Sequence, residues 1–157
     1  MIEDPAVVAR AIIDDNLYMV LGTADEDGRP WVSPVYFAHL DYREFLWVSR
    51  PDVQHSQNLA ARPETSIVVF NSSTPIGTGR GVYMSALAEE VAGDARIHAI
   101  DLFSRRSVRH GGTEWTLSDI QAPAPLRLYR AKATAHYVLA GSADVRIEVA
   151  LATPVGS

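Results

Sequence analysis

The chain has 157 residues, of which 47% are apolar, enough for a single domain, residues 1–157, with a hydrophobic core. Fourteen basic against 19 acidic residues leave a net charge of −5, which disfavours a nucleic-acid partner because phosphate binding needs a basic surface. The absence of cysteine excludes disulfides, cysteine-ligated zinc and thiol nucleophiles.

The first half of the chain predicts a short helix followed by three consecutive antiparallel strands. Asp4 and Pro5 are typical of a helix start, and Asp27-Gly28 is a hairpin signal between two strand-like runs. Pro34 cannot donate to a sheet ladder, so its strand is expected at a sheet edge or with a bulge. The predicted strands are residues 17–23, 30–39 and 44–49.

The second half predicts two more helices among further strands. Asp52 is the expected N-cap of a helix over residues 53–61, and Asp94 that of a helix to about Val108. The latter helix should bury Ile97, Ile100 and either Leu102 or Phe103. The predicted strands are residues 65–70, 82–91, 126–139 and 145–151. Hairpin-length turns favour a mainly β (α+β) fold, an antiparallel barrel with helices on its outside.

Targeting and catalytic signatures are missing from the sequence. The first residues lack the basic region of a secretory signal, and no apolar run approaches the roughly 20 residues of a membrane span. We therefore expect a soluble cytoplasmic protein without membrane contacts. There is no GxSxG elbow, HExxH pair or P-loop, and the five histidines show no metal-ligand spacing.

Two further motifs have simple structural interpretations. The run GTGRG at residues 77–81 joins two predicted strands rather than opening a helix, so we favour a turn over a phosphate loop. Arg105, Arg106, Arg109 and His110 form a basic cluster, which we interpret as a solvated helix end rather than an anion site.

Residues 47–58 (WVSRPDVQHSQN) are the strongest candidate for a binding site. A strand there runs through a turn into a helix, so hydroxyl, amide, imidazole and guanidinium groups gather beside free helix N–H groups. Such a combination suits an anion, phosphate above all. The alternative is that Ser49 and Gln54 only cap the helix.

From Leu17 to Val91 the sequence resembles the pyridoxamine 5'-phosphate oxidase-like family of flavin-binding split barrels. The segments that carry the resemblance are LGTADEDGRPWVSPVYF, FLWVSRPDVQHSQNLAARPETSIVVF and GRGVYMSALAEEV. The later helix and strands fit the family's order of elements. This resemblance implies a six-stranded antiparallel split barrel with two or three flanking helices, and a homodimer that holds one FMN in each of two interface clefts.

The resemblance also implies roles for individual residues. It places Ser33, Pro34 and Val35 beside the isoalloxazine ring, and Trp47, Val48 and Ser49 along the ribityl chain and phosphate. Gln54 and His55 would bind the phosphate, and Asn58 lies one turn further along the same helix. Arg80 and Gly81 would lie near the flavin. No metal ligand is implied. His55 stands where lysine is common, and the C-terminal tryptophan and arginine pattern of true pyridoxamine-phosphate oxidases is missing, which disfavours the vitamin as the small-molecule substrate.

Three hypotheses about function follow from the resemblance. The first is an FMN-dependent oxidoreductase, in which the cofactor performs the hydride chemistry. The second is a reductase that uses a deazaflavin coenzyme on the same fold, with Arg50 and Arg62 holding its longer anionic tail. The third is a non-catalytic protein that binds flavin or haem.

Overall fold

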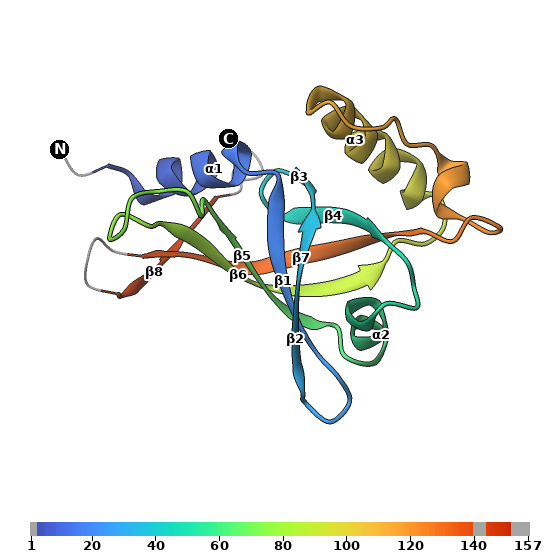
Figure 1. The fold of residues 1–157 in the computed structure, drawn as a ribbon, viewed down its shortest axis with the longest axis horizontal. Helices are drawn as coiled ribbons and strands as arrows, with labels where there is room; N and C mark the ends of the chain where they lie inside the picture. Colours follow the sequence, from blue (N-terminus) through green and yellow to red (C-terminus); the bar gives the residue numbers. More distant parts are fainter. Residues whose placement is uncertain (1–2, 140–143, 152–157) are drawn as a thin grey trace.

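In the computed structural model, residues 3–139 and 144–151 are described, and they form a mostly antiparallel sheet curled into a half-barrel (Figure 1). The helices are α1 (Pro5–Asp15), α2 (Gln54–Ala61) and α3 (Ala95–Arg109), with a 3₁₀ turn, η1, at Leu117–Ile120. The strands are β1 (Tyr18–Ala24), β2 (Pro30–Tyr36), β3 (Ala38–Leu40), β4 (Glu44–Ser49), β5 (Glu64–Phe70), β6 (Gly81–Glu90), β7 (Arg127–Leu139) and β8 (Arg146–Val149). At 15 residues α3 is the longest helix in this part of the chain, and none of these helices could cross a bilayer.

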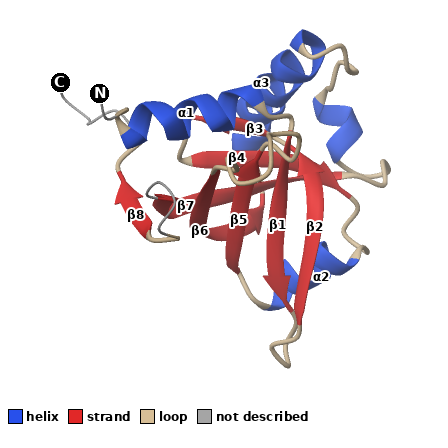
Figure 2. Ribbon diagram, turned by 60° about the vertical axis from the view of Figure 1, so that its left-hand side comes forward, coloured by secondary structure: helices blue, strands red, loops and turns tan. Residues whose placement is uncertain are grey.

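The pairing of the strands follows the order β2-β1-β5-β6-β7-β4-β3, and β8 adds to the outer side of β7. Only Phe37 separates β2 from β3, so one continuous segment pairs first with β1 and then with β4. With β2 and β3 taken as that one strand and the short β8 left aside, the barrel has six antiparallel strands and three flanking helices, which confirms the predicted split barrel. Figure 2 shows α1 and α3 at one end of the sheet and α2 at the other.

The break at Phe37 is the feature of the sheet that the sequence analysis missed. Residues 30–39 were expected to form one unbroken strand, whereas Phe37 leaves the ladder, and its buried ring packs among the core side chains. Its N–H donates to the carbonyl of Leu17 at 3.3 Å, which keeps the segment attached to β1 at the point of divergence. The prediction for Pro34 is confirmed, because β2 pairs with β1 alone and is an edge strand.

Two apolar clusters hold the helices on the sheet. The barrel interior is filled by inward residues of every long strand, including Leu21, Phe45 and Val69, against α1. A second cluster packs α3 on the other face of β4 and β7. Ile100 and Phe103 are buried there as expected. Ile97 is 57% exposed, because it lies outside the face of α3 that packs on the sheet.

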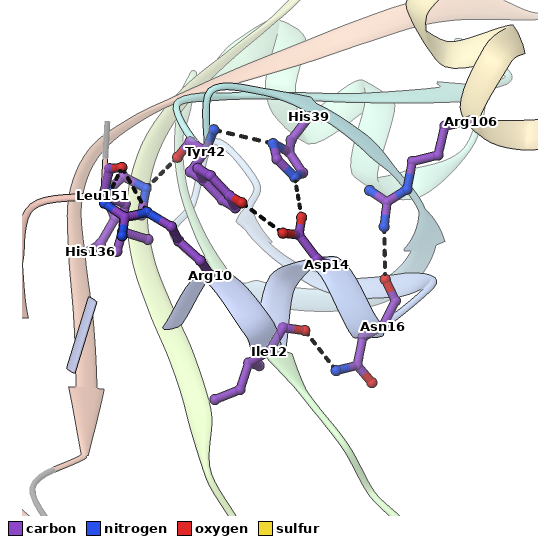
Figure 3. Close-up of polar contacts among 9 residues, drawn as sticks. All are labelled: Arg10, Ile12, Asp14, Asn16, His39, Tyr42, Arg106, His136 and Leu151. Carbon is purple, nitrogen blue, oxygen red and sulfur yellow. Dashed lines mark hydrogen bonds and ion pairs between the residues drawn. The ribbon is translucent and has the colours of Figure 1, made fainter. Parts of the chain in front are cut away.

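Tyr42 joins α1 to the barrel through the turn between β3 and β4 (Figure 3). Its hydroxyl donates to Asp14 at 2.6 Å, its N–H donates to Nδ1 of His39 at 3.1 Å, and its carbonyl accepts from His136 of β7. Since Nδ1 of His39 accepts, the proton lies on Nε2, which binds Asp14 at 2.8 Å. Burial and the neighbouring Asp14 raise the pKa of Tyr42 to about 12, so the hydroxyl keeps its proton.

We predict that Tyr42→Phe lowers the free energy of unfolding by about 1 kcal/mol, because a partly exposed hydrogen bond to a carboxylate is lost without a change of shape. For a domain of this size that corresponds to a fall of about 2–4 °C in Tm. Thermal unfolding followed by circular dichroism measures it. Tyr18→Phe is the matched control, since the Tyr18 side chain is 59% exposed. Equal effects of the two variants would contradict the role given to Tyr42.

Candidate functional site

Three of the predicted residues, Ser33, Ser49 and His55, meet in one cluster. Nδ1 of His55 lies 3.2 Å from the hydroxyl of Ser33, and Nε2 lies 2.8 Å from the hydroxyl of Ser49. The three side chains come from β2, β4 and α2, which are separated in the sequence but adjacent in space. The imidazole therefore bridges two strands that do not pair with each other.

The cluster lies at the split of the barrel. From Phe37 onwards β3 pairs with residues 44–46 of β4, whereas β2 turns away to pair with β1. Residues 47–49 of β4 pair with β7 on one side only, and β2 has no second neighbour among the described strands. Backbone donors and acceptors of two strand edges are therefore left without ladder partners on either side of His55.

His55 is set up for recognition rather than for nucleophilic catalysis. Burial lowers its pKa below the ordinary value for histidine, so the neutral ring is favoured at pH 7. Both ring nitrogens bind serine hydroxyls, and within the described residues no carboxylate is hydrogen-bonded to the imidazole. An activated serine nucleophile needs a third group that orients the base, and this cluster lacks one.

The start of α2 differs from the sequence prediction. The helix begins at Gln54 with Val53 at the N-cap position, and no side chain caps it. Asp52, the expected cap, instead binds Arg50 through two hydrogen bonds of 2.9 and 2.8 Å. The predicted capping by Ser49 or Gln54 is likewise absent from this helix start. Because the first N–H groups of a helix have no intrahelical acceptor, α2 offers free donors beside His55.

Gln54 and Asn58 anchor the helix instead of joining the histidine cluster. The amide of Gln54 donates to Asn58 at 2.7 Å, and the amide of Asn58, only 2% exposed, donates to Thr23 of β1 at 3.0 Å. Thr23 in turn donates to the carbonyl of Trp31 at 3.3 Å. This chain of hydrogen bonds fixes α2 against β1 and β2, so Asn58 holds the helix that carries His55.

Other predicted residues face different parts of the molecule. Trp47 is fully buried in the barrel and stacks on Tyr129, with ring centroids 5.7 Å apart, whereas Val48 packs into the cluster under α3. Val35 is buried in the core, and Pro34 is exposed on the outer face of β2. Consecutive strand residues point to opposite faces, so the side chains of residues 33–35 or 47–49 cannot all line one site.

Arg80 and Gly81 lie at the other end of the sheet. Arg80 forms an ion pair with Glu3 at 3.1 Å. Gly81 pairs with Phe70, the last residue of β5, whereas α2 lies just before the first residue of β5. The structure therefore does not bring these two residues together with His55 within one chain.

Trp31 is a site residue that the sequence analysis missed. Its indole N–H donates to the hydroxyl of Ser33 at 3.1 Å, and the side chain is 51% exposed. The period-two alternation of Trp31, Ser33 and Val35 along one strand was the signal that could have found it.

The cluster is half-buried. Among the cavities on the described part of the chain are five of about 320 to 570 Å³, and none of these five is lined by Ser33, Ser49 or His55. Among residues 3–139 and 144–151 there is also no group of three acidic or histidine side chains arranged to hold a metal ion.

Comparison with known proteins gives a family and a fold. A family model described as pyridoxamine 5'-phosphate oxidase matches residues 8–140. No curated protein matches the sequence.

Several solved structures share the fold. A heme binding protein from Mycobacterium smegmatis superposes with a TM-score of 0.74 at 17% identity, over 95% of this chain and 59% of that one. HutZ, a heme storage protein from Vibrio cholerae, gives 0.65 at 21% identity, over 85% and 91%. An F420 reductase gives 0.61 at 19% identity, over 86% and 98%. With the family model matching most of its length, the chain belongs to the pyridoxamine 5'-phosphate oxidase family.

Proposed function

We propose that the protein is an FMN-dependent oxidoreductase that acts on a small molecule, as a homodimer with the cofactor at the interface. The observation that carries the proposal is the cluster of Ser33, Ser49 and His55 beside the uncapped start of α2. Hydroxyl and imidazole groups next to free helix N–H groups are the donors that a phosphate monoester needs.

The residues present fit the two ends of FMN. His55, Ser49 and the first N–H groups of α2 would hold the phosphate. The unpaired edges of β2 and β4 offer backbone donors and acceptors at the spacing of a strand, which suits the polar edge of a heteroaromatic ring. The half-exposed indole of Trp31 adds an aromatic surface near Ser33.

FMN, when bound, supplies hydride transfer, so the protein needs no acid, base or nucleophile of its own for that step. The cluster is consistent with a binding role, because both ring nitrogens of His55 are hydrogen-bonded to serine hydroxyls and not to a carboxylate. The chain's own residues bind and orient the cofactor: Ser33 and Ser49 hold the imidazole, and Asn58 holds the helix that carries it.

The outer face of the sheet is the surface on which a second copy of the chain would pack. The outer face of the sheet carries Val32, Phe70 and Leu87, all exposed, and Val32 is 67% exposed. The same face contains two shallow cavities of about 550 and 570 Å³, lined in part by Gly22, Val32 and Ser85. Contiguous exposed apolar side chains of this kind are typical of protein interfaces.

A deazaflavin coenzyme and haem are the alternatives. For the first, Arg50 and Arg62 are both exposed near α2, but Arg50 is already paired with Asp52 and Arg62 donates to the carbonyl of Glu26. Haem is supported by the similar folds of the heme binding protein and the heme storage protein.

The absorption spectrum of the protein after incubation with each cofactor and removal of the unbound excess tests the choice. We expect retention of FMN and a two-band flavin spectrum. Retention of the deazaflavin alone, with one near-ultraviolet band, or of haem alone, with a Soret band, would replace FMN by that cofactor. Retention of none of them would refute cofactor binding.

We predict that His55→Ala weakens FMN binding by about 10- to 150-fold and leaves riboflavin binding almost unchanged. Riboflavin lacks the phosphate, and one charge-assisted hydrogen bond contributes roughly 1.5–3 kcal/mol. Fluorescence titration of both ligands measures the two constants. His98→Ala is the matched control, because His98 is exposed on α3. Equal losses for FMN and riboflavin would show that His55 only supports the local fold.

The preference for FMN should also depend on pH. Burial lowers the pKa of His55 in the free protein, whereas a bound phosphate favours the charged imidazole and raises it. Binding therefore takes up a proton, and the preference for FMN over riboflavin declines as pH rises through the bound-state pKa. In His55→Ala this part of the pH dependence should be absent.

We predict that the wild-type chain has twice the monomer mass of 17.2 kDa in solution and that Val32→Glu shifts it towards the monomer. The substitution puts a charge into the exposed apolar face at the edge strand β2, where desolvation on association is costly. Val108→Glu is the control, since Val108 is also exposed, at 53%, but lies on α3. Light scattering across the micromolar range reports the mass. A wild-type monomer, or a Val32→Glu dimer of unchanged stability, would contradict this interface.

A further inference from the structure

A cavity of about 470 Å³ opens between the C-terminal half of α3 and the end of α1, on the side of the barrel away from α2. It is lined by Asp14, His39, Leu102, Arg105, Arg106, Arg109 and His110. These residues include the basic cluster that the sequence analysis interpreted as a solvated helix end. The structure shows that this cluster borders a hollow.

The charges around the cavity do not balance. Three arginines face one carboxylate, and that carboxylate, Asp14, already accepts from His39 and Tyr42 at 2.8 and 2.6 Å. Arg105 is paired along the helix with Asp101 at 3.0 Å, whereas Arg109 makes no ion pair with any described residue. A local excess of positive charge is unusual in a chain whose net charge is −5.

Of the three arginines, Arg106 is half-buried, whereas Arg105 and Arg109 are exposed. Its guanidinium lies 4.5 Å from the ring centre of Phe37 and donates through Nη2 to the carbonyl of Asn16 at 3.1 Å. Nη1 is buried without a hydrogen-bond acceptor among the described residues. The nearby carboxylate of Asp14 favours the charge of Arg106 but also binds His39 and Tyr42, so an anion in the adjoining cavity would add compensation for this half-buried cation.

His110 is held at the rim of the same cavity. Its Nδ1 is hydrogen-bonded to the hydroxyl of Tyr36 at 2.9 Å, which orients the ring and leaves Nε2 without a partner in the described chain. The C-terminal dipole of α3 accounts for basic residues near Arg109, because cations are stabilised there. It accounts neither for the burial of Arg106 nor for the hollow beside it.

We propose that this cavity is a second binding site, separate from the histidine cluster, for a small ligand that carries a phosphate group. Arg109 and His110 donate to the phosphate oxygens, and Arg106 supplies a buried positive charge behind them. Guanidinium groups match the planar pairs of oxygens on phosphate, and a dianion compensates more of the excess charge than a carboxylate does. The site does not depend on the identity of the cofactor.

Binding of inorganic phosphate to the His55→Ala protein tests this proposal, because that background lacks the phosphate contact proposed for FMN. Calorimetric titration at constant ionic strength should give one site per chain, and phosphate should bind more tightly than acetate. Arg109→Gln should weaken phosphate binding by about tenfold or more. Arg109 is exposed, so the variant is expected to fold, and circular dichroism checks this.

Arg29→Gln provides the matched control, since it removes the same charge from the exposed turn between β1 and β2. It should leave phosphate binding unchanged. In a parallel titration followed by NMR, the imidazole resonances of His110 should shift on addition of phosphate. An absence of binding in the His55→Ala background, or equal affinities of the Arg109→Gln and Arg29→Gln proteins, would overturn the proposal. Failure of FMN binding to the wild-type protein would leave this site unaffected, so the two proposals are tested separately.

Discussion

The arrangement of this protein depends on one segment that pairs with two different strands. Residues 30–36 follow β1, residues 38–40 follow β4, and the buried ring of Phe37 fixes the point at which the segment changes partner. On the N-terminal side of Phe37, β2 follows β1 and does not pair with β4, so β2 and the end of β4 diverge. The split of the barrel, the exposed strand edges and the place of α2 all follow from this divergence.

The histidine cluster occupies the split because α2 follows β4 after only a short turn. His55 is thereby placed between a hydroxyl from each diverging strand, and a buried chain of hydrogen bonds through Asn58 and Thr23 holds the helix at its depth. Burial lowers the pKa of the imidazole and so favours its neutral form. A neutral ring between two hydroxyls can exchange its partners for a phosphate and gain a proton at the same time, whereas a lysine would carry its charge permanently.

At the other end of the sheet, polar contacts attach the helices more directly. Asp14, His39 and Tyr42 connect α1 to the hairpin between β3 and β4, and Arg106 crosses from α3 to the carbonyl of Asn16. Asp14 is engaged on both oxygens by neutral donors, so it is less available as a counter-ion for the arginines of α3. The two candidate anion sites therefore differ in their surroundings. The site at the start of α2 lies between strand edges, and the site at the end of α3 lies between helices.

The local pattern of the sequence determined most of the elements and the fold class. Alternation, the Asp-Gly hairpin and Pro34 on an edge strand are properties of neighbouring residues, and β4 has the predicted bounds. The resemblance selected the family and a wider set of site residues, of which Ser33, Ser49 and His55 meet in one cluster. Tertiary structure alone decided that Phe37 divides a strand, that Asp52 pairs with Arg50 instead of capping α2, and that Arg106 is buried beside a cavity. Each of these outcomes depends on a partner far away in the chain or on competition between partners, and local periodicity does not encode that choice.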